Sequence, residues 1–110
     1  MQQFQGRTAF LTGAASGIGR CLAIELAKAG CHLCLVDVNA EGLKALAAEL
    51  ETSGVRVFQF PCNLTDRKAV SATIANALAQ AGGIDLLINN AGVAYYVPTD
   101  QMTQAQWDCL

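Results

Sequence analysis

The stretch Thr12-Gly13-Ala14-Ala15-Ser16-Gly17-Ile18-Gly19 decides the fold of this chain. It follows the apolar run 9–11 and leads into a segment, 17–29, whose apolar residues recur at helical spacing. A strand that feeds a glycine-rich turn into a helix N-terminus favours an anion, because the first helical turn has unpaired backbone N–H groups at the positive end of the helix dipole. Glycines let the chain turn sharply and let a phosphate approach without meeting a Cβ atom. The stretch therefore predicts a phosphate-binding turn.

Outward from this turn, strand-like and helix-like segments alternate. Short apolar runs are typical of parallel strands covered on both faces, and each is followed by a segment with helical periodicity. Asn39 is expected to cap the second helix, and either Thr65 or Asp66 the third. The pattern predicts strands at 8–12, 32–37, 55–60 and 85–89, helices at 17–29, 40–52 and 67–81, and the start of a last helix at 103–106.

This alternation predicts one α/β domain over residues 1–110. We expect a Rossmann-type doubly wound parallel sheet of which only the first half, about four strands, is present. The segment 55–60 is poorer in apolar residues on one face, so we place it near the sheet edge and expect Pro61 to end it.

Asp37 stands at the end of the second predicted strand, roughly 20 residues past the first glycine of the turn. A carboxylate there can accept hydrogen bonds from both hydroxyls of an adenosine ribose, and it would repel a 2′-phosphate. Neither Ser16 nor Val38 carries a positive charge that would offset this repulsion. NAD is therefore the expected cofactor, in preference to NADP. In the alternative interpretation, Asp37 only starts the turn into the next helix.

The glycine spacing T-G-x-x-x-G-x-G, the placement of Asp37 and the tetrapeptide Asn89-Asn90-Ala91-Gly92 together resemble the short-chain dehydrogenases/reductases. The resemblance covers nearly the whole chain but only the front portion of that family's usual length. It implies an oxidoreductase that acts on alcohol or carbonyl groups by hydride transfer. Asn89 is expected to form a structural bond between strands. The cofactor-binding residues implied are Gly13, Ala15, Ser16, Gly17, Ile18, Gly19, Asp37, Asn63, Leu64, Asn90, Ala91 and Gly92.

Within this set, the resemblance implies that Asn63 takes the exocyclic amino group of adenine and that the Leu64 backbone covers the ring. The alternative is that Asn63 forms an Asx turn that merely reverses the chain, and the two interpretations are compatible.

The catalytic part that the family implies is missing from this chain. Family members use a Ser, a Tyr-x-x-x-Lys pair and a supporting Asn, with the tyrosine as general acid and base. Tyr95 is followed four residues later by Thr99 and Tyr96 by Asp100, and no lysine follows Lys68. We therefore assign no catalytic residue here and expect the chain alone to be inactive, as the N-terminal part of a longer enzyme.

A second hypothesis is an inactive NAD-binding or interaction module. Its motivation is the strand 86–88, which would be central in a complete sheet and is expected here to be an unpaired apolar edge. Such an edge invites association with another chain.

Composition narrows the classes of partner. The net charge of −2 gives no basic surface for nucleic acid, and no apolar run approaches the ~20 residues of a membrane span. The N-terminus lacks the features of a signal peptide, so a cytoplasmic location is expected. A homo-oligomer is expected by family resemblance. The substrate stays open among sugars, steroids, acyl thioesters and simple alcohols.

Cys31-His32-Leu33-Cys34 has the C-x-x-C spacing of metal and redox sites and contains the single histidine. If the segment opens a strand, however, Cys31 and Cys34 point to opposite faces. We therefore predict free thiols that pack as small hydrophobic residues, and no metal site.

Overall fold

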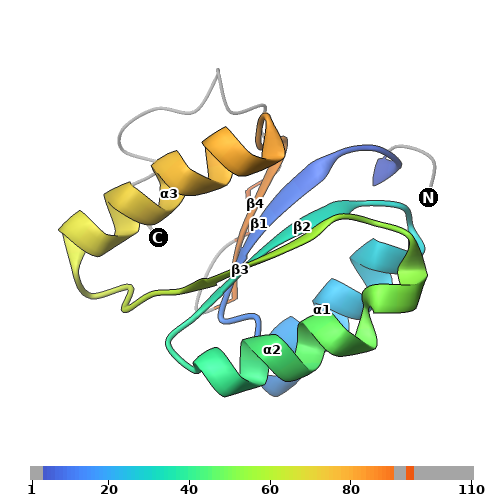
Figure 1. Ribbon diagram of the computed structural model, residues 1–110, viewed down its shortest axis with the longest axis horizontal. Helices are drawn as coiled ribbons and strands as arrows, with labels where there is room; N and C mark the ends of the chain where they lie inside the picture. Colours follow the sequence, from blue (N-terminus) through green and yellow to red (C-terminus); the bar gives the residue numbers. More distant parts are fainter. Residues whose placement is uncertain (1–3, 91–93, 96–110) are drawn as a thin grey trace.

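The computed structural model describes residues 4–90 and 94–95. It contains a five-stranded sheet in the order β3-β2-β1-β4-β5, in which the first four strands are parallel (Figure 1). The strands are β1 (Thr8–Thr12), β2 (His32–Asp37), β3 (Val57–Pro61), β4 (Leu86–Asn89) and β5 (Ala94–Tyr95). The predicted doubly wound α/β architecture is confirmed, with β1 at its centre.

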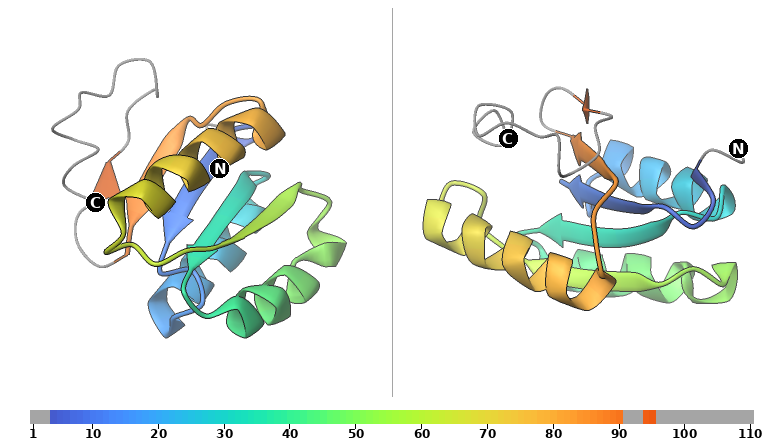
Figure 2. Two further views of the ribbon diagram at one scale, coloured as in Figure 1. Left: turned by 60° about the vertical axis from the view of Figure 1, so that its left-hand side comes forward. Right: turned by 90° about the horizontal axis from the view of Figure 1, so that it is seen from above.

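Helices cover both faces of this sheet. They are α1 (Gly17–Lys28), α2 (Ala40–Glu49) and α3 (Arg67–Ala81), and a short 3-10 helix, η2 (Glu51–Ser53), follows α2. Figures 1 and 2 show α1 and α2 together on one side of the strands and α3 on the other. No helix in the described ranges is long and apolar enough to cross a membrane.

Side-chain caps fix where the helices begin. Ser16 caps α1, Asn39 caps α2, and Asp66, rather than Thr65, caps α3 by accepting from the amides of Lys68 and Ala69. The predicted helix 40–52 is too long, because α2 ends at Glu49. Beyond it the chain tightens into η2 before turning at Gly54, whose φ of +82° suits glycine.

The edge position predicted for the third strand is confirmed, but its bounds are shifted. Pro61 belongs to β3 and pairs in register with Asp37, instead of ending the strand before it. A proline has no N–H to donate, and an edge strand tolerates this because only one of its sides must form a ladder.

The prediction that residues 86–88 form an unpaired edge is wrong. β5 runs antiparallel to β4 and pairs Leu87 with Tyr95 and Ile88 with Ala94. A strand of two residues has no detectable sequence periodicity, which is why it was not expected.

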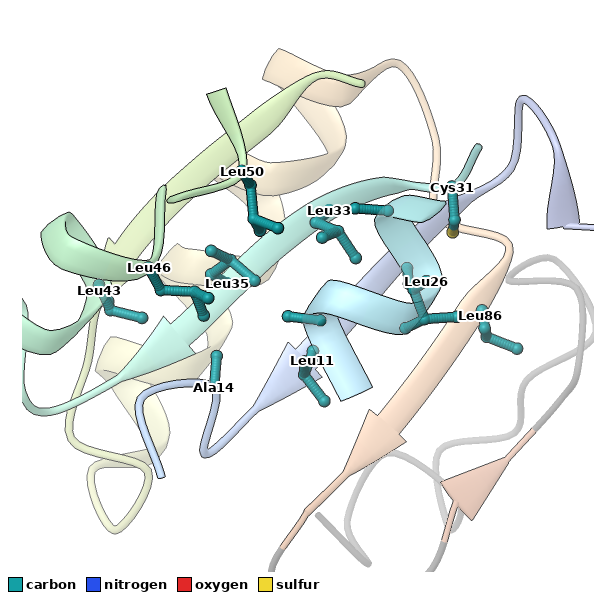
Figure 3. Close-up of a cluster of buried hydrophobic side chains, with 13 residues drawn as sticks. Leu11, Ala14, Leu26, Cys31, Leu33, Leu35, Leu43, Leu46, Leu50 and Leu86 are labelled. Atoms are coloured by element: carbon teal, nitrogen blue, oxygen red, sulfur yellow. The ribbon is translucent and has the colours of Figure 1, made fainter. Parts of the chain in front are cut away.

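Two apolar clusters fill the layers on either side of the sheet. One lies under α1 and α2 and contains Leu11, Leu35 and Leu46 (Figure 3), and the other lies under α3 and contains Phe10, Val36 and Phe60. Cys31 belongs to the first cluster and Cys34 to the second, which confirms that the two thiols face opposite sides.

Candidate functional site

The glycine-rich turn joins the end of β1 to the start of α1. Gly13 has a φ of +64°, a left-handed conformation in which a Cβ is strained. Ser16 stabilises the turn on both sides, because its amide and its hydroxyl donate to the Gly13 carbonyl (3.1 and 2.7 Å) and its Oγ accepts from the Gly19 amide at 3.2 Å. The turn is therefore preorganised by its own hydrogen bonds.

The first turn of α1 still has donors to offer. The Gly19 amide donates to Ser16 Oγ, whereas the amides of Gly17 and Ile18 have no acceptor among the described residues. Gly17 and Ile18 are exposed, and a Cβ built on Gly17 meets nothing within 4 Å. The helix N-terminus thus presents free amides toward open space, as an anion requires.

Asp37 lies directly against this turn. One carboxylate oxygen accepts from the Ala15 amide at 3.1 Å and the other from the Asn39 amide at 2.9 Å. The second bond shows that Asp37 does start the turn into α2, as the alternative interpretation held. The first bond brings its carboxylate to the glycine-rich turn, 22 residues earlier in the sequence.

The end of β4 reaches the same turn from the other side. Thr12 Oγ1 donates to Asn89 Oδ1 at 3.1 Å, which confirms Asn89 as a structural tie between β1 and β4. The Asn90 amide nitrogen donates to the Gly13 carbonyl at 3.2 Å and to Ser16 Oγ at 2.6 Å. Asn90 therefore braces the turn. The predicted residues Ala91 and Gly92 lie outside the described residues.

The loop after β3 contains the last two predicted residues. Asn63 forms an Asx turn, because its Oδ1 accepts from the Thr65 amide at 3.0 Å and from Thr65 Oγ1 at 2.7 Å. Leu64 is half-buried and packs against the cluster under α3. Asn63 itself is exposed at the end of β3, beside the end of β2.

Val38 lies on the same rim, and sequence reasoning assigned it no binding role. Its side chain is 73% exposed directly after Asp37, although valine is usually buried. An apolar side chain exposed beside a carboxylate is a surface on which a flat ring could rest. The detectable signal was its position next to Asp37.

These residues fit a dinucleotide. Free helix-terminal amides suit a diphosphate, and a carboxylate on the neighbouring strand suits ribose hydroxyls. All of them lie at the carboxyl ends of β1 to β4, where ligands bind in open α/β sheets.

Comparison with known proteins agrees with this geometry. A family model described as short chain dehydrogenase matches residues 7–110. D-threitol dehydrogenase of Mycolicibacterium smegmatis is 40% identical over 106 residues, which cover 96% of this chain and 41% of that protein. The chain belongs to the short-chain dehydrogenases.

Solved structures of a dehydrogenase and a reductase share the fold. NAD+-bound xylitol dehydrogenase matches with a TM-score of 0.79 at 30% identity, over 97% of this chain and 42% of that chain. L-sorbose reductase of Gluconobacter frateurii, complexed with NADPH and L-sorbose, matches with a TM-score of 0.77 at 32% identity, over 97% and 41%. This short-chain dehydrogenase chain spans less than half the length of these relatives.

Proposed function

We propose that this chain binds NAD, in preference to NADP, as the cofactor-binding part of an oxidoreductase that acts on alcohol or carbonyl groups. The observation that carries the proposal is the bond from the Ala15 amide to the Asp37 carboxylate. It holds the side chain that we propose as the ribose acceptor against the turn that we propose as the phosphate site. A carboxylate there favours free hydroxyls and opposes the added charge of a 2′-phosphate.

Each part of the dinucleotide has residues suited to it. The amides of Gly17 and Ile18 would hold the diphosphate, and Asp37 the adenosine ribose. Asn63 and Leu64 stand where the base would lie. Gly13, Ala15, Ser16 and Gly19 would shape the turn, and Asn90, Ala91 and Gly92 would border the second ribose.

A bound NAD would supply the hydride chemistry, and the residues named above would bind its diphosphate, its riboses and its adenine. The sequence contains no Tyr-x-x-x-Lys pair, so no residue of these 110 is proposed to move the proton on the substrate oxygen. The chain alone should therefore show no NAD reduction with small alcohols above background. A homo-oligomer and a cytoplasmic location remain predictions from the sequence. The pairing of β4 with β5 removes the observation that motivated the interaction-module hypothesis.

Calorimetric titration with NAD and with NADP tests the proposal. We expect NAD to bind more tightly. Asp37→Asn removes the charge and should bring the affinity for NADP closer to that for NAD, because the 2′-phosphate is then no longer repelled. Glu51→Gln, which removes a charge on exposed η2, should leave the preference unchanged.

Gly17→Val tests the phosphate site itself. The new side chain has open space in the protein and would occupy the approach to the free amides, so we expect NAD binding to be lost while the fold is retained. Gly13→Val is a poorer test, because a Cβ at Gly13 meets Asn90 Nδ2 at 3.0 Å and the φ is positive. Unchanged NAD affinity in folded Gly17→Val would refute the proposed binding mode.

A further inference from the structure

Gly42 lies in the first turn of α2, beside both residues that hold the Asp37 carboxylate. The amides of Ala15 and Asn39 donate to the two oxygens of that carboxylate, at 3.1 and 2.9 Å. A Cβ at Gly42 would lie 2.8 Å from Ala15 Cβ and 2.7 Å from Asn39 Nδ2. The missing side chain therefore leaves room at the point where the start of α2 meets the glycine-rich turn.

No requirement within α2 accounts for a glycine at this position. Gly42 is not among the glycines with a positive φ, and a helix interior favours alanine over glycine. Asn39 caps α2 by accepting from the Gly42 amide at 3.0 Å, but in the capping box a glutamate or glutamine occupies this same third helical position, so the cap itself tolerates a side chain there. The contact with Ala15 remains, because its Cβ is attached to the backbone of the glycine-rich turn and cannot rotate away.

We infer that Gly42 is a positioning residue for Asp37, because it lets α2 lie close enough to the glycine-rich turn for the Ala15 amide to reach the carboxylate. The Asn39 amide is two residues from Asp37 and begins α2, so this local bond would survive a displacement of the helix. The Ala15 bond spans 22 residues and joins two elements, so a side chain at Gly42 would lengthen it. The inference rests on the proposed function, in which Asp37 holds the adenosine ribose.

Gly42→Ala adds a single methyl group at this contact. In calorimetric titrations of the 110-residue chain, we expect it to weaken NAD binding roughly two- to tenfold, the range that one hydrogen bond contributes. NADP carries a phosphate in place of one of the ribose hydroxyls from which Asp37 would accept, so its affinity should change less. The preference for NAD over NADP should therefore fall, whereas a general loosening of the turn would weaken the binding of both dinucleotides alike.

Ala15→Gly supplies the matched background, because it removes the methyl group that the new side chain would meet. In that background the further change Gly42→Ala should alter neither the NAD affinity nor the preference over NADP. An equal loss of NAD affinity in both backgrounds overturns the inference. Circular dichroism checks the folding of each variant. Gly42→Ala that folds only in the Ala15→Gly background supports the contact, and a loss of folding in both backgrounds overturns the inference.

Hydrogen exchange of the Ala15 amide tests the inference without a ligand. In the free protein this amide donates to Asp37, so Gly42→Ala should accelerate its exchange by a similar factor, whereas the Asn39 amide should keep its rate. Unchanged exchange at Ala15 contradicts the role of Gly42. If the parent chain binds neither dinucleotide, the proposed function fails, and exchange at Ala15 alone then decides whether Gly42 positions Asp37.

Discussion

Two glycines of the glycine-rich turn differ in what surrounds them. A Cβ on Gly19 would lie 2.0 Å from the Gly13 carbonyl oxygen and 3.0 Å from the Ala14 Cα, and both are backbone atoms that cannot rotate away. A Cβ on Gly17 meets nothing within 4 Å. Gly19 thus lets α1 pack against the end of β1, whereas Gly17 borders open space at the first turn of α1.

This difference predicts effects of different size on stability for the same substitution. Gly19→Ala should lower the free energy of unfolding by ~2 kcal/mol or more, because the backbone must move to relieve the overlap. Gly17→Ala should stay within ~1 kcal/mol of the parent, since alanine restricts the unfolded chain without a clash. Urea unfolding followed by circular dichroism measures both. Equal losses of stability in the two variants would contradict the packing role of Gly19.

The positions of the site residues were predictable, and their contacts were not. Asp37 ends one predicted strand and Asn63 comes after the next, and parallel strands bring their carboxyl ends to one edge. The bonds from Asn90 to Gly13 and Ser16 join residues 77 and 74 positions apart, which no local pattern encodes. The Asx turn at Asn63 was foreseen as an alternative, but the engagement of its oxygen depends on the Thr65 rotamer.

At the scale of elements, the extended backbone of β2 and the residue before it explains why the two cysteines of the C-x-x-C pair are buried on opposite faces of the sheet. Alternation along an extended chain sends Cys31 and Cys34 to the two cores, where both are fully buried. Burial raises the pKa of each thiol from 9.0 to about 11. Few thiolates form there near neutral pH, so the pair is poorly suited to redox or metal chemistry.

The raised pKa values predict an alkaline loss of stability. Between pH 9 and 11 the unfolded chain releases the protons of Cys31 and Cys34, while the folded chain retains them. The stabilisation is therefore complete below pH 9 and is lost as the pH rises through about 11. Denaturant unfolding at several pH values measures this loss. The free energy of unfolding should fall less steeply with rising pH in Cys34→Ala than in the parent chain. Cys21→Ala, at an exposed position of α1, is the control and should keep the parent slope.

The observed helix bounds show which local sequence signals were sufficient to predict where a helix begins and ends. The bounds of α3 were predicted correctly, since Asp66 accepts from two first-turn amides and Gly82 turns left-handed at its end. The end of α2 was not, because the sequence offers no breaker before Gly54. There the residues of η2 are exposed, and the Ser53 hydroxyl donates to the Leu50 carbonyl across the 3-10 turn.

For the molecule as a whole, the helices on the two sides of the sheet bury unequal amounts of apolar side chain. The layer under α1 and α2 receives fully buried leucines such as Leu43 and Leu46. On the other side, α3 buries only Ala77 fully, Ile74 is half-buried, and Leu78 remains 37% exposed. Because little apolar area holds α3 to the sheet, it should be the least stable helix of the three.

Native-state hydrogen exchange tests this order of stability. Amides in α3 should exchange faster than those of α1 and β2, through an opening that leaves the rest folded. Ile74→Ala should accelerate exchange in α3 selectively, since it weakens only that contact. Leu46→Ala removes a fully buried side chain, should cost ~2–5 kcal/mol and should accelerate exchange throughout β1 and β2. Equal protection of the amides in α3 and β2 would contradict this order of stability, because the layer under α3 would then be no weaker. The stability of this chain would then depend on the hydrogen bonds of the sheet more than on the helices that cover it.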